Sequence, residues 1–201
     1  MSRAKIAEDT WKRVDKVNAE LFVLTYGSIV AQLCNDCDEY TEVNKQLDRM
    51  GFNIGVRLIE DFLARTGQGK CRDFRETADV LSKVGFKIFL NITPTVTNWS
   101  ADNKSFSLIL DENPLAGERA QLRITTETDA LDFVELPDDG RASEDLWYSN
   151  VLCGVIRGAM EMIQVQVEVQ FVSDVLRGDS LTELRVMFIR SIEEGQPVND
   201  E

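Results

Sequence analysis

The apolar positions in the first half of the chain recur at helical spacing. Residues 18–35 and 41–66 both place apolar side chains three or four positions apart, which predicts two amphipathic helices. A third helix is predicted over 74–91, because Asp73 followed by Glu76 forms an acidic variant of the capping box. Its expected buried stripe has spacings of four, three, four and three, and consists of Phe74, Ala78, Leu81, Gly85 and Ile88.

The second half of the chain changes to a period of two. Pro94 stops helix formation, and the runs 95–97 and 105–111 on either side of a polar loop predict a β-hairpin. A fourth helix is expected to begin near Asp145, and strands follow at 165–171 and around 184–188. The predicted class is therefore α+β, an antiparallel β-sheet of about four strands with α-helices packed on one side.

The size and composition of the chain fit one globular domain. The sequence has 201 residues, of which 43% are hydrophobic and 28% charged, as in ordinary globular proteins. We assign a single domain to residues 18–193. The first seventeen residues are expected to form a poorly ordered N-terminal segment, and residues 194–201 an acidic tail.

The charge and the missing residue types exclude several functions. The formal net charge of -13 repels nucleic acid and anionic lipid, so any membrane contact is expected to be peripheral. Histidine is absent, which removes the commonest general base and the usual haem ligand. The sequence Gly67-Gln-Gly69 lacks the following Gly-Lys-Ser/Thr of a phosphate-binding loop. We expect no nucleotide, no catalytic constellation and no enzymatic activity.

The four cysteines are interpreted as free thiols in a reduced, cytosolic setting. They are Cys34, Cys37, Cys71 and Cys153. Cys34 and Cys37 form a single Cys-x-x-Cys, which supplies only two of the four ligands that a structural zinc ion needs. No metal is expected.

Cys71 is the candidate functional residue. It lies between Lys70 and Arg72 and just before the expected start of a helix, and these cationic surroundings favour the thiolate. The small residues Ala78 and Gly85 on the buried stripe suggest a groove that an apolar group fills, with a thiolate at its mouth that takes a fatty acyl group as a thioester. Two plainer alternatives stay open: a loop cysteine without a role, and a glycine that packs against another helix.

A further pair of glycines marks a surface of close approach. Gly154 and Gly158 are four residues apart within the fourth helix. This spacing predicts packing on the sheet or on a partner subunit.

Several long runs resemble the TRAPP (trafficking protein particle) small subunits of the subunit-three type. The resemblance extends from about Glu20 to the last strand. It is carried by residues 44–65, 71–79, 92–94, 98–100, 133–137, 148–150 and 153–161.

This resemblance implies a structural role in vesicle tethering. TRAPP small subunits share an α+β fold and form hetero- or homodimers with one another. Their complex acts in endoplasmic reticulum-to-Golgi transport and activates a Rab-type GTPase, which places the chain in the cytoplasm, peripheral to the cis-Golgi and the endoplasmic reticulum. The resemblance also implies palmitate on Cys71, inserted in a hydrophobic channel, with Gly85 at the position of a small channel-lining residue.

The chain departs from the family pattern at two places. Residues 116–131 form an atypical insertion before the Phe-Val-Glu-Leu-Pro run, and Lys70 stands where some relatives carry arginine. Two other functions remain open, a free-standing acyl carrier or lipid sensor on the same fold, and a thiol enzyme that uses Cys71.

Overall fold

The computed structural model describes residues 2–111, 113–116 and 140–192. The predicted helices and strands lie in these ranges, whereas the 133–137 run, the acidic tail and nearly all of the 116–131 insertion lie outside them. The longer helices are α1 (Arg3–Trp11), α2 (Ala19–Asp36), α3 (Tyr40–Thr66) and α7 (Val151–Met162), and a short α6 (Ala142–Asp145) precedes α7.

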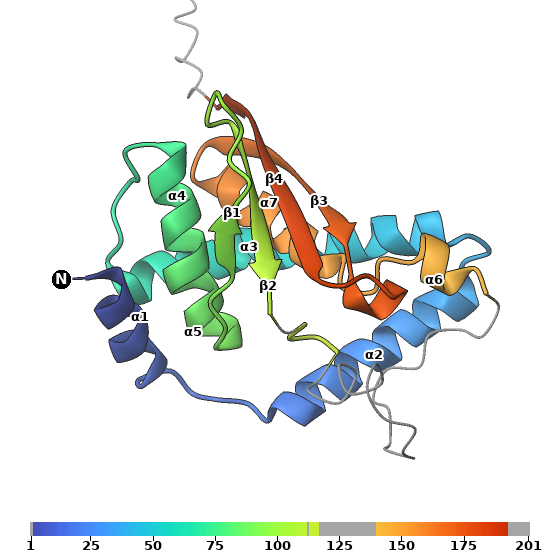
Figure 1. Ribbon diagram of the computed structural model, residues 1–201. Helices are drawn as coiled ribbons and strands as arrows, with labels where there is room; N and C mark the ends of the chain where they lie inside the picture. The colour runs from blue at the N-terminus through green and yellow to red at the C-terminus, as the bar shows by residue number, and fades with distance from the viewer. Residues whose placement is uncertain (1, 112, 117–139, 193–201) are drawn as a thin grey trace, which may run out of the picture.

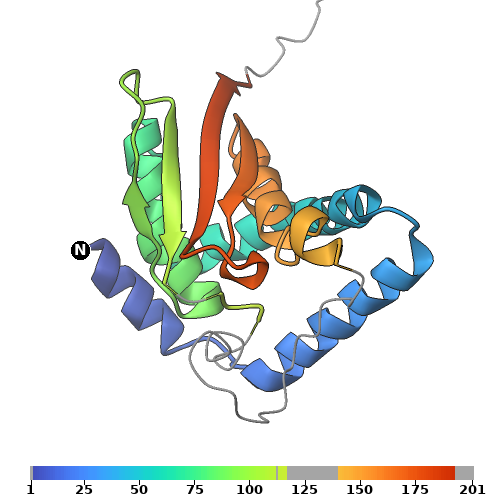
Figure 2. The same ribbon diagram turned by 45° about the vertical axis from the view of Figure 1, so that its right-hand side comes forward.

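The β-sheet has four antiparallel strands and confirms the predicted α+β class. The strands are β1 (Thr95–Thr97), β2 (Ser105–Leu110), β3 (Val165–Ser173) and β4 (Thr182–Ser191), in the spatial order β1-β2-β4-β3. The helical layer lies on one face of this sheet, as Figures 1 and 2 show. Alternate residues of the strands pack against this layer, as expected for a sheet with one covered face.

The third predicted helix is divided into three parts. These are α4 (Phe74–Val80), a π-helical turn η1 (Leu81–Gly85) and α5 (Phe86–Leu90). The predicted cap is confirmed, because the Asp73 side chain accepts a hydrogen bond of 2.8 Å from the amide of Glu76. The Glu76 carboxylate in turn accepts a bond from the Arg72 amide. A π turn holds more residues than an α turn, so the faces of the helix shift along its length.

Helices α3 and α7 touch through their glycines. A Cβ atom built on Gly154 would overlap the backbone of α3, at 2.7 Å from the amide nitrogen of Phe52. A Cβ on Gly55 would come within 2.8 Å of the backbone nitrogen of Ala159. The prediction that Gly154 and Gly158 pack on the sheet or on a partner subunit was therefore wrong. They pack within the chain, because α3 carries its own pair of glycines four residues apart.

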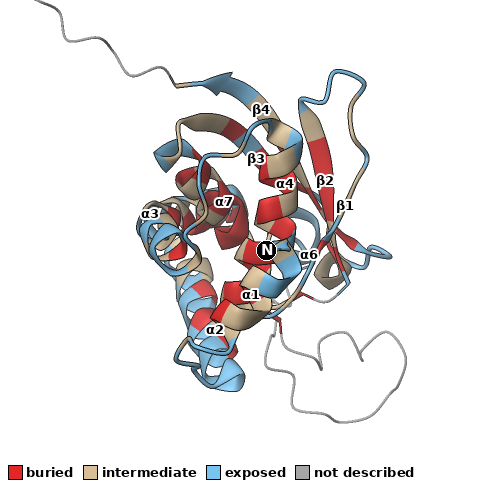
Figure 3. Ribbon diagram, turned by 90° about the vertical axis from the view of Figure 1, so that its left-hand side faces the viewer, coloured by how far each residue is buried: buried red, intermediate tan, exposed pale blue. Residues whose placement is uncertain are grey.

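The N-terminal segment differs from the expected poorly ordered end. Residues 3–11 form α1, which is capped by the Ser2 side chain and packs on η1 and α5 (Figure 3). Ala7 is buried in this contact, and Ile6 packs beside it. The prediction failed because apolar residues in this short segment are few, and one small side chain is enough to let the helix dock closely.

Helix α2 leaves an unusually apolar surface exposed. It contacts the body through Val23, Tyr26 and Val30, and the Tyr26 hydroxyl donates to the backbone oxygen of Tyr148 at 2.5 Å. Leu21 and Leu24, however, are 63% and 44% exposed. None of the helices in the described ranges is both long and apolar enough to cross a bilayer.

Candidate functional site: an apolar cavity bordered by Cys71

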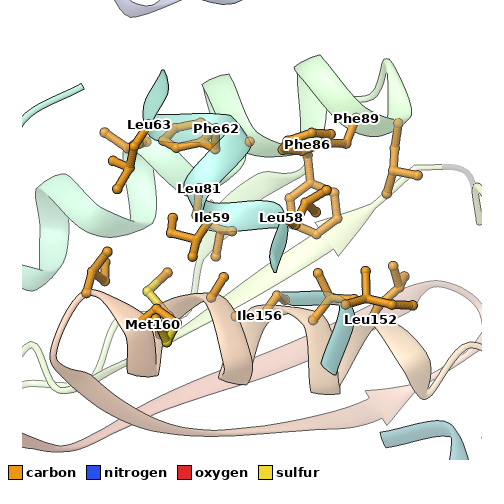
Figure 4. Close-up of a pocket in the computed structure, with 18 of the residues that line it drawn as sticks. Leu58, Ile59, Phe62, Leu63, Leu81, Phe86, Phe89, Leu152, Ile156 and Met160 are labelled. Atoms are coloured by element: carbon orange, nitrogen blue, oxygen red, sulfur yellow. The ribbon is translucent and has the colours of Figure 1, made fainter. Parts of the chain in front are cut away.

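A cavity of about 760 Å³ lies between the helices. The α7 side chains Leu152, Ile156 and Met160 lie opposite residues of α3 and of the α4–η1–α5 segment (Figure 4). Near one end α2 contributes Phe22 and Tyr26. The volume falls within the range of pockets that hold small organic ligands.

The lining of the cavity is almost entirely aliphatic and aromatic. Helix α3 provides one wall, with Met50, Ile54, Leu58, Ile59, Phe62 and Leu63. Burying one methylene group is favourable by about 0.8 kcal/mol, so the site suits a long hydrocarbon chain. It offers little to a polar or charged ligand, because few lining groups could replace the hydrogen bonds that such a ligand makes with water.

Cys71 is the only one of the four cysteines that lines the cavity. It lies in the loop between α3 and α4, next to Gly69 and Lys70, which also line the cavity, and its side chain is partly buried. Cys153 is fully buried in the core, where desolvation raises the pKa of its thiol and keeps it protonated. Position alone therefore selects Cys71 as the sulfur that can carry a group inside the cavity.

The surroundings of Cys71 do not favour the thiolate in the way that the sequence suggested. Burial raises the pKa of the Cys71 thiol, and the carboxylates of Glu76 and Asp73 raise it further, whereas Thr77 and Arg3 lower it. Arg72 is bonded to Glu76 at 3.1 Å, and its side chain is 85% exposed. These surroundings do not support the expected activated thiolate, because the tertiary fold desolvates the sulfur and two anions of the adjacent helix start lie near it.

The predicted lining residues separate into two groups. Leu81 and Gly85 line the cavity, whereas Phe74, Ala78 and Ile88 do not. The Phe74 ring packs on the sheet, 5.2 Å from the ring of Phe106 between centroids.

Ala78 is fully buried in the main core, and Ile88 lies in the second apolar cluster, beside Ala7 of α1. The α4–α5 segment is thus buried on three sides, toward the sheet, α1 and the cavity. A single stripe of positions cannot describe such a helix, and the π turn changes its register midway.

Most of the cavity wall was not identified from the sequence. The doublets Leu58-Ile59 and Phe62-Leu63 widen the apolar face of α3 beyond what one neighbouring helix needs. The extra width of this apolar face was the feature of the sequence from which a second apolar contact of α3 could have been predicted. Among the described residues there is no group of three or more histidine, cysteine, aspartate or glutamate side chains that could hold a metal ion.

Comparison with known proteins is consistent with this geometry. The model of the transport protein particle (TRAPP) component family matches residues 22–187. The transport protein particle subunit bet3 of Schizosaccharomyces pombe is 56% identical over 201 residues, covering 100% of both chains. The trafficking protein particle complex subunit BET3 of Saccharomyces cerevisiae is 52% identical, covering 98% of this chain and 94% of the relative.

A solved structure is also similar. The crystal structure of a trafficking protein particle complex subunit 3 from Naegleria fowleri, described as covalently bound to palmitic acid, superposes with a TM-score of 0.77. It shares 41% identity and covers 90% of this chain and 100% of its own. The family match, the near-complete relatives and the shared fold agree: this chain belongs to the TRAPP family of transport-particle subunits.

Proposed function

We propose that this chain is a structural subunit of a TRAPP vesicle-tethering complex and carries palmitate as a thioester on Cys71, with the acyl chain inside the cavity. The observation that carries the proposal is the position of Cys71, the one cysteine at an apolar cavity of about 760 Å³. The covalently bound palmitic acid in the Naegleria fowleri structure supports the same chemistry. Burying about fifteen carbons at 0.8 kcal/mol each would contribute up to about 12 kcal/mol.

The exposed apolar surface of α2 supports an assembly role. Leu21, Phe22, Leu24 and Ile29 of α2 and Ile54 of α3 are each more than a third exposed. A helix that is apolar around most of its circumference is normally covered. We propose that another TRAPP small subunit covers this surface in a hetero- or homodimer.

Through such dimers the chain would contribute to a Rab-GTPase exchange factor in endoplasmic reticulum-to-Golgi transport, on the cytoplasmic surface of the membrane. The exchange activity would belong to the assembled complex. The names of the relatives, which describe subunits of a transport or trafficking particle, support membership of such a complex.

Intact mass spectrometry of protein from its native source tests the lipid proposal. We expect an added mass equal to one palmitoyl group, which neutral hydroxylamine removes because it cleaves thioesters. In Cys71→Ser the covalent adduct should be absent. An unmodified native mass would refute the acylation of Cys71. Lipid that exchanges freely in and out of the Cys71→Ser protein would instead favour an acyl carrier.

The substitution Leu24→Asp tests the dimer surface. Leu24 is 44% exposed, so the isolated chain should tolerate aspartate, but a buried unpaired carboxylate at a subunit interface costs several kcal/mol. We expect the variant to lose its partner in co-purification, with a decrease in affinity of at least about a hundredfold. Gln170→Asp, on the exposed face of β3, is the matched control. Equal recovery of the partner with both variants would place the interface elsewhere.

A further inference from the structure

Helix α1 is joined to the segment beside Cys71 by ion pairs from one arginine to two carboxylates. The guanidinium of Arg3 contacts the Glu76 carboxylate at 2.5 Å and the Asp79 carboxylate at 3.1 Å. The side chains of Arg3 and Glu76 are 28% and 17% exposed, so water screens this pair only in part. Both acids belong to α4, which begins at Phe74, shortly after Cys71 in the chain.

The apolar side of α1 packs on the same wall that lines the cavity. Ala7 lies in a buried cluster with Phe62, Val80, Val84 and Ile88, and Ile59, Cys71 and Phe89 pack against this cluster. Most of these residues also line the cavity. Helix α1 is therefore the outer layer behind the cavity wall, and Cys71 lies between the two.

The charged groups around the sulfur have opposing effects. Glu76 and Asp73, at the start of α4, disfavour a negative sulfur, whereas Arg3 from α1 favours it. The residues of α3 that pack in the apolar cluster beside Cys71 are Ile59 and Phe62, and α5 contributes Phe89. Lys70 and Arg72 flank the cysteine in the chain, but Arg72 points into solvent and is bonded to Glu76. Arg3 is thus the cation that the fold brings to this site from a distant part of the sequence.

We propose that Arg3 is a positioning residue for the acylation of Cys71, presented by α1, and that it neutralises the Glu76 and Asp79 carboxylates and favours the reactive form of the sulfur. This inference rests on the proposed acylation. In that reaction Cys71 releases its proton to water, and its sulfur bonds to the carbonyl carbon of an acyl thioester. The bond from that carbon to the donor sulfur breaks, and the departing thiolate takes up a proton.

The pH dependence of thiol alkylation tests the inference without requiring acylation. The rate of Cys71 modification by iodoacetamide follows the thiolate fraction, and Cys71→Ser corrects for the other cysteines. In Arg3→Gln we expect an alkylation rate about two- to fivefold lower at neutral pH, the size expected for one partly screened charge, and a pH profile displaced upward. Arg3→Lys should restore most of the rate, and Lys5→Gln, on the exposed side of α1, should leave it unchanged.

The opposite substitution provides an independent check. Glu76→Gln removes an anion near the sulfur, so alkylation should become faster. An unchanged pH profile of alkylation in Arg3→Gln would overturn the inference. A faster reaction would also overturn it, because it would mean that α1 had simply detached and exposed the sulfur. The rate at which Cys71 takes up palmitate from palmitoyl-coenzyme A should rank the variants in the same order as the alkylation rate does. If no variant is acylated but the alkylation profiles shift as expected, the charge effect stands and the acylation proposal fails.

Discussion

Replacing Gly154 with alanine is expected to destabilise the protein strongly. The new methyl group would overlap the Asp48 carbonyl and lie 2.7 Å from the Phe52 amide nitrogen. Both are backbone atoms of α3, which cannot move aside as the end of a side chain would. Forcing the helices apart would disturb the interface on which much of the buried core rests, at a cost of at least about 3 kcal/mol. That is a large part of the 5–15 kcal/mol typical of a domain.

Gly85→Ala is the matched control, because it is the same substitution in another helical segment. A Cβ on Gly85 would meet nothing closer than 3.8 Å, the Cδ1 atom of Leu81. Alanine also favours helix by up to about 1 kcal/mol over glycine. Urea unfolding of both variants measures the difference. If Gly154→Ala were as stable as Gly85→Ala, the close contact of α3 and α7 would be disproved.

The order of helices and strands was predictable because each element has one dominant buried face. The strand 165–171 alternates valine and phenylalanine with polar residues, and β3 buries Val167, Val169 and Phe171 as expected. The third helix has no single buried face, since Phe74, Leu81 and Ile88 pack toward three different neighbours. A sequence period reveals that a residue is buried, but it does not reveal against what.

The site was found in part because Cys71 carries a local signal. Its position before the Asp73 cap singled out the cysteine that lines the cavity, and the family resemblance independently indicated the same residue. The electrostatics were not predictable, because the effect of burial and the approach of Arg3 both depend on contacts between distant segments. Adjacent charges such as Arg72 misled the prediction, since a neighbour in sequence is free to turn toward solvent.

The substitution Gly85→Leu is expected to abolish acyl insertion while preserving the fold. Gly85 lines the cavity, and a Cβ atom there would make only ordinary contacts, with Leu81 Cδ1 at 3.8 Å and the Val80 carbonyl oxygen at 4.0 Å. Leucine is a good helix former, so it should not disturb α4 or α5. Its side chain can extend into the cavity because position 85 lines it. It would then occupy volume that the acyl chain needs. Overpacking of this kind costs about 1–3 kcal/mol, so the acylated fraction should fall by about five- to a hundredfold.

Lys87→Leu is the control, because it adds the same side chain on the solvent side of the same helical segment. Intact mass spectrometry should show the palmitoyl adduct in Lys87→Leu and in Gly85→Ala, but not in Gly85→Leu, while all three variants unfold cooperatively. The comparison separates size from helix propensity, since alanine and leucine differ little in propensity but greatly in volume. The α3 and α7 walls are held together by the contact between their glycines, so these two walls cannot separate to make room for both the leucine and the lipid. Full acylation of Gly85→Leu would therefore mean that the chain on Cys71 lies outside this cavity.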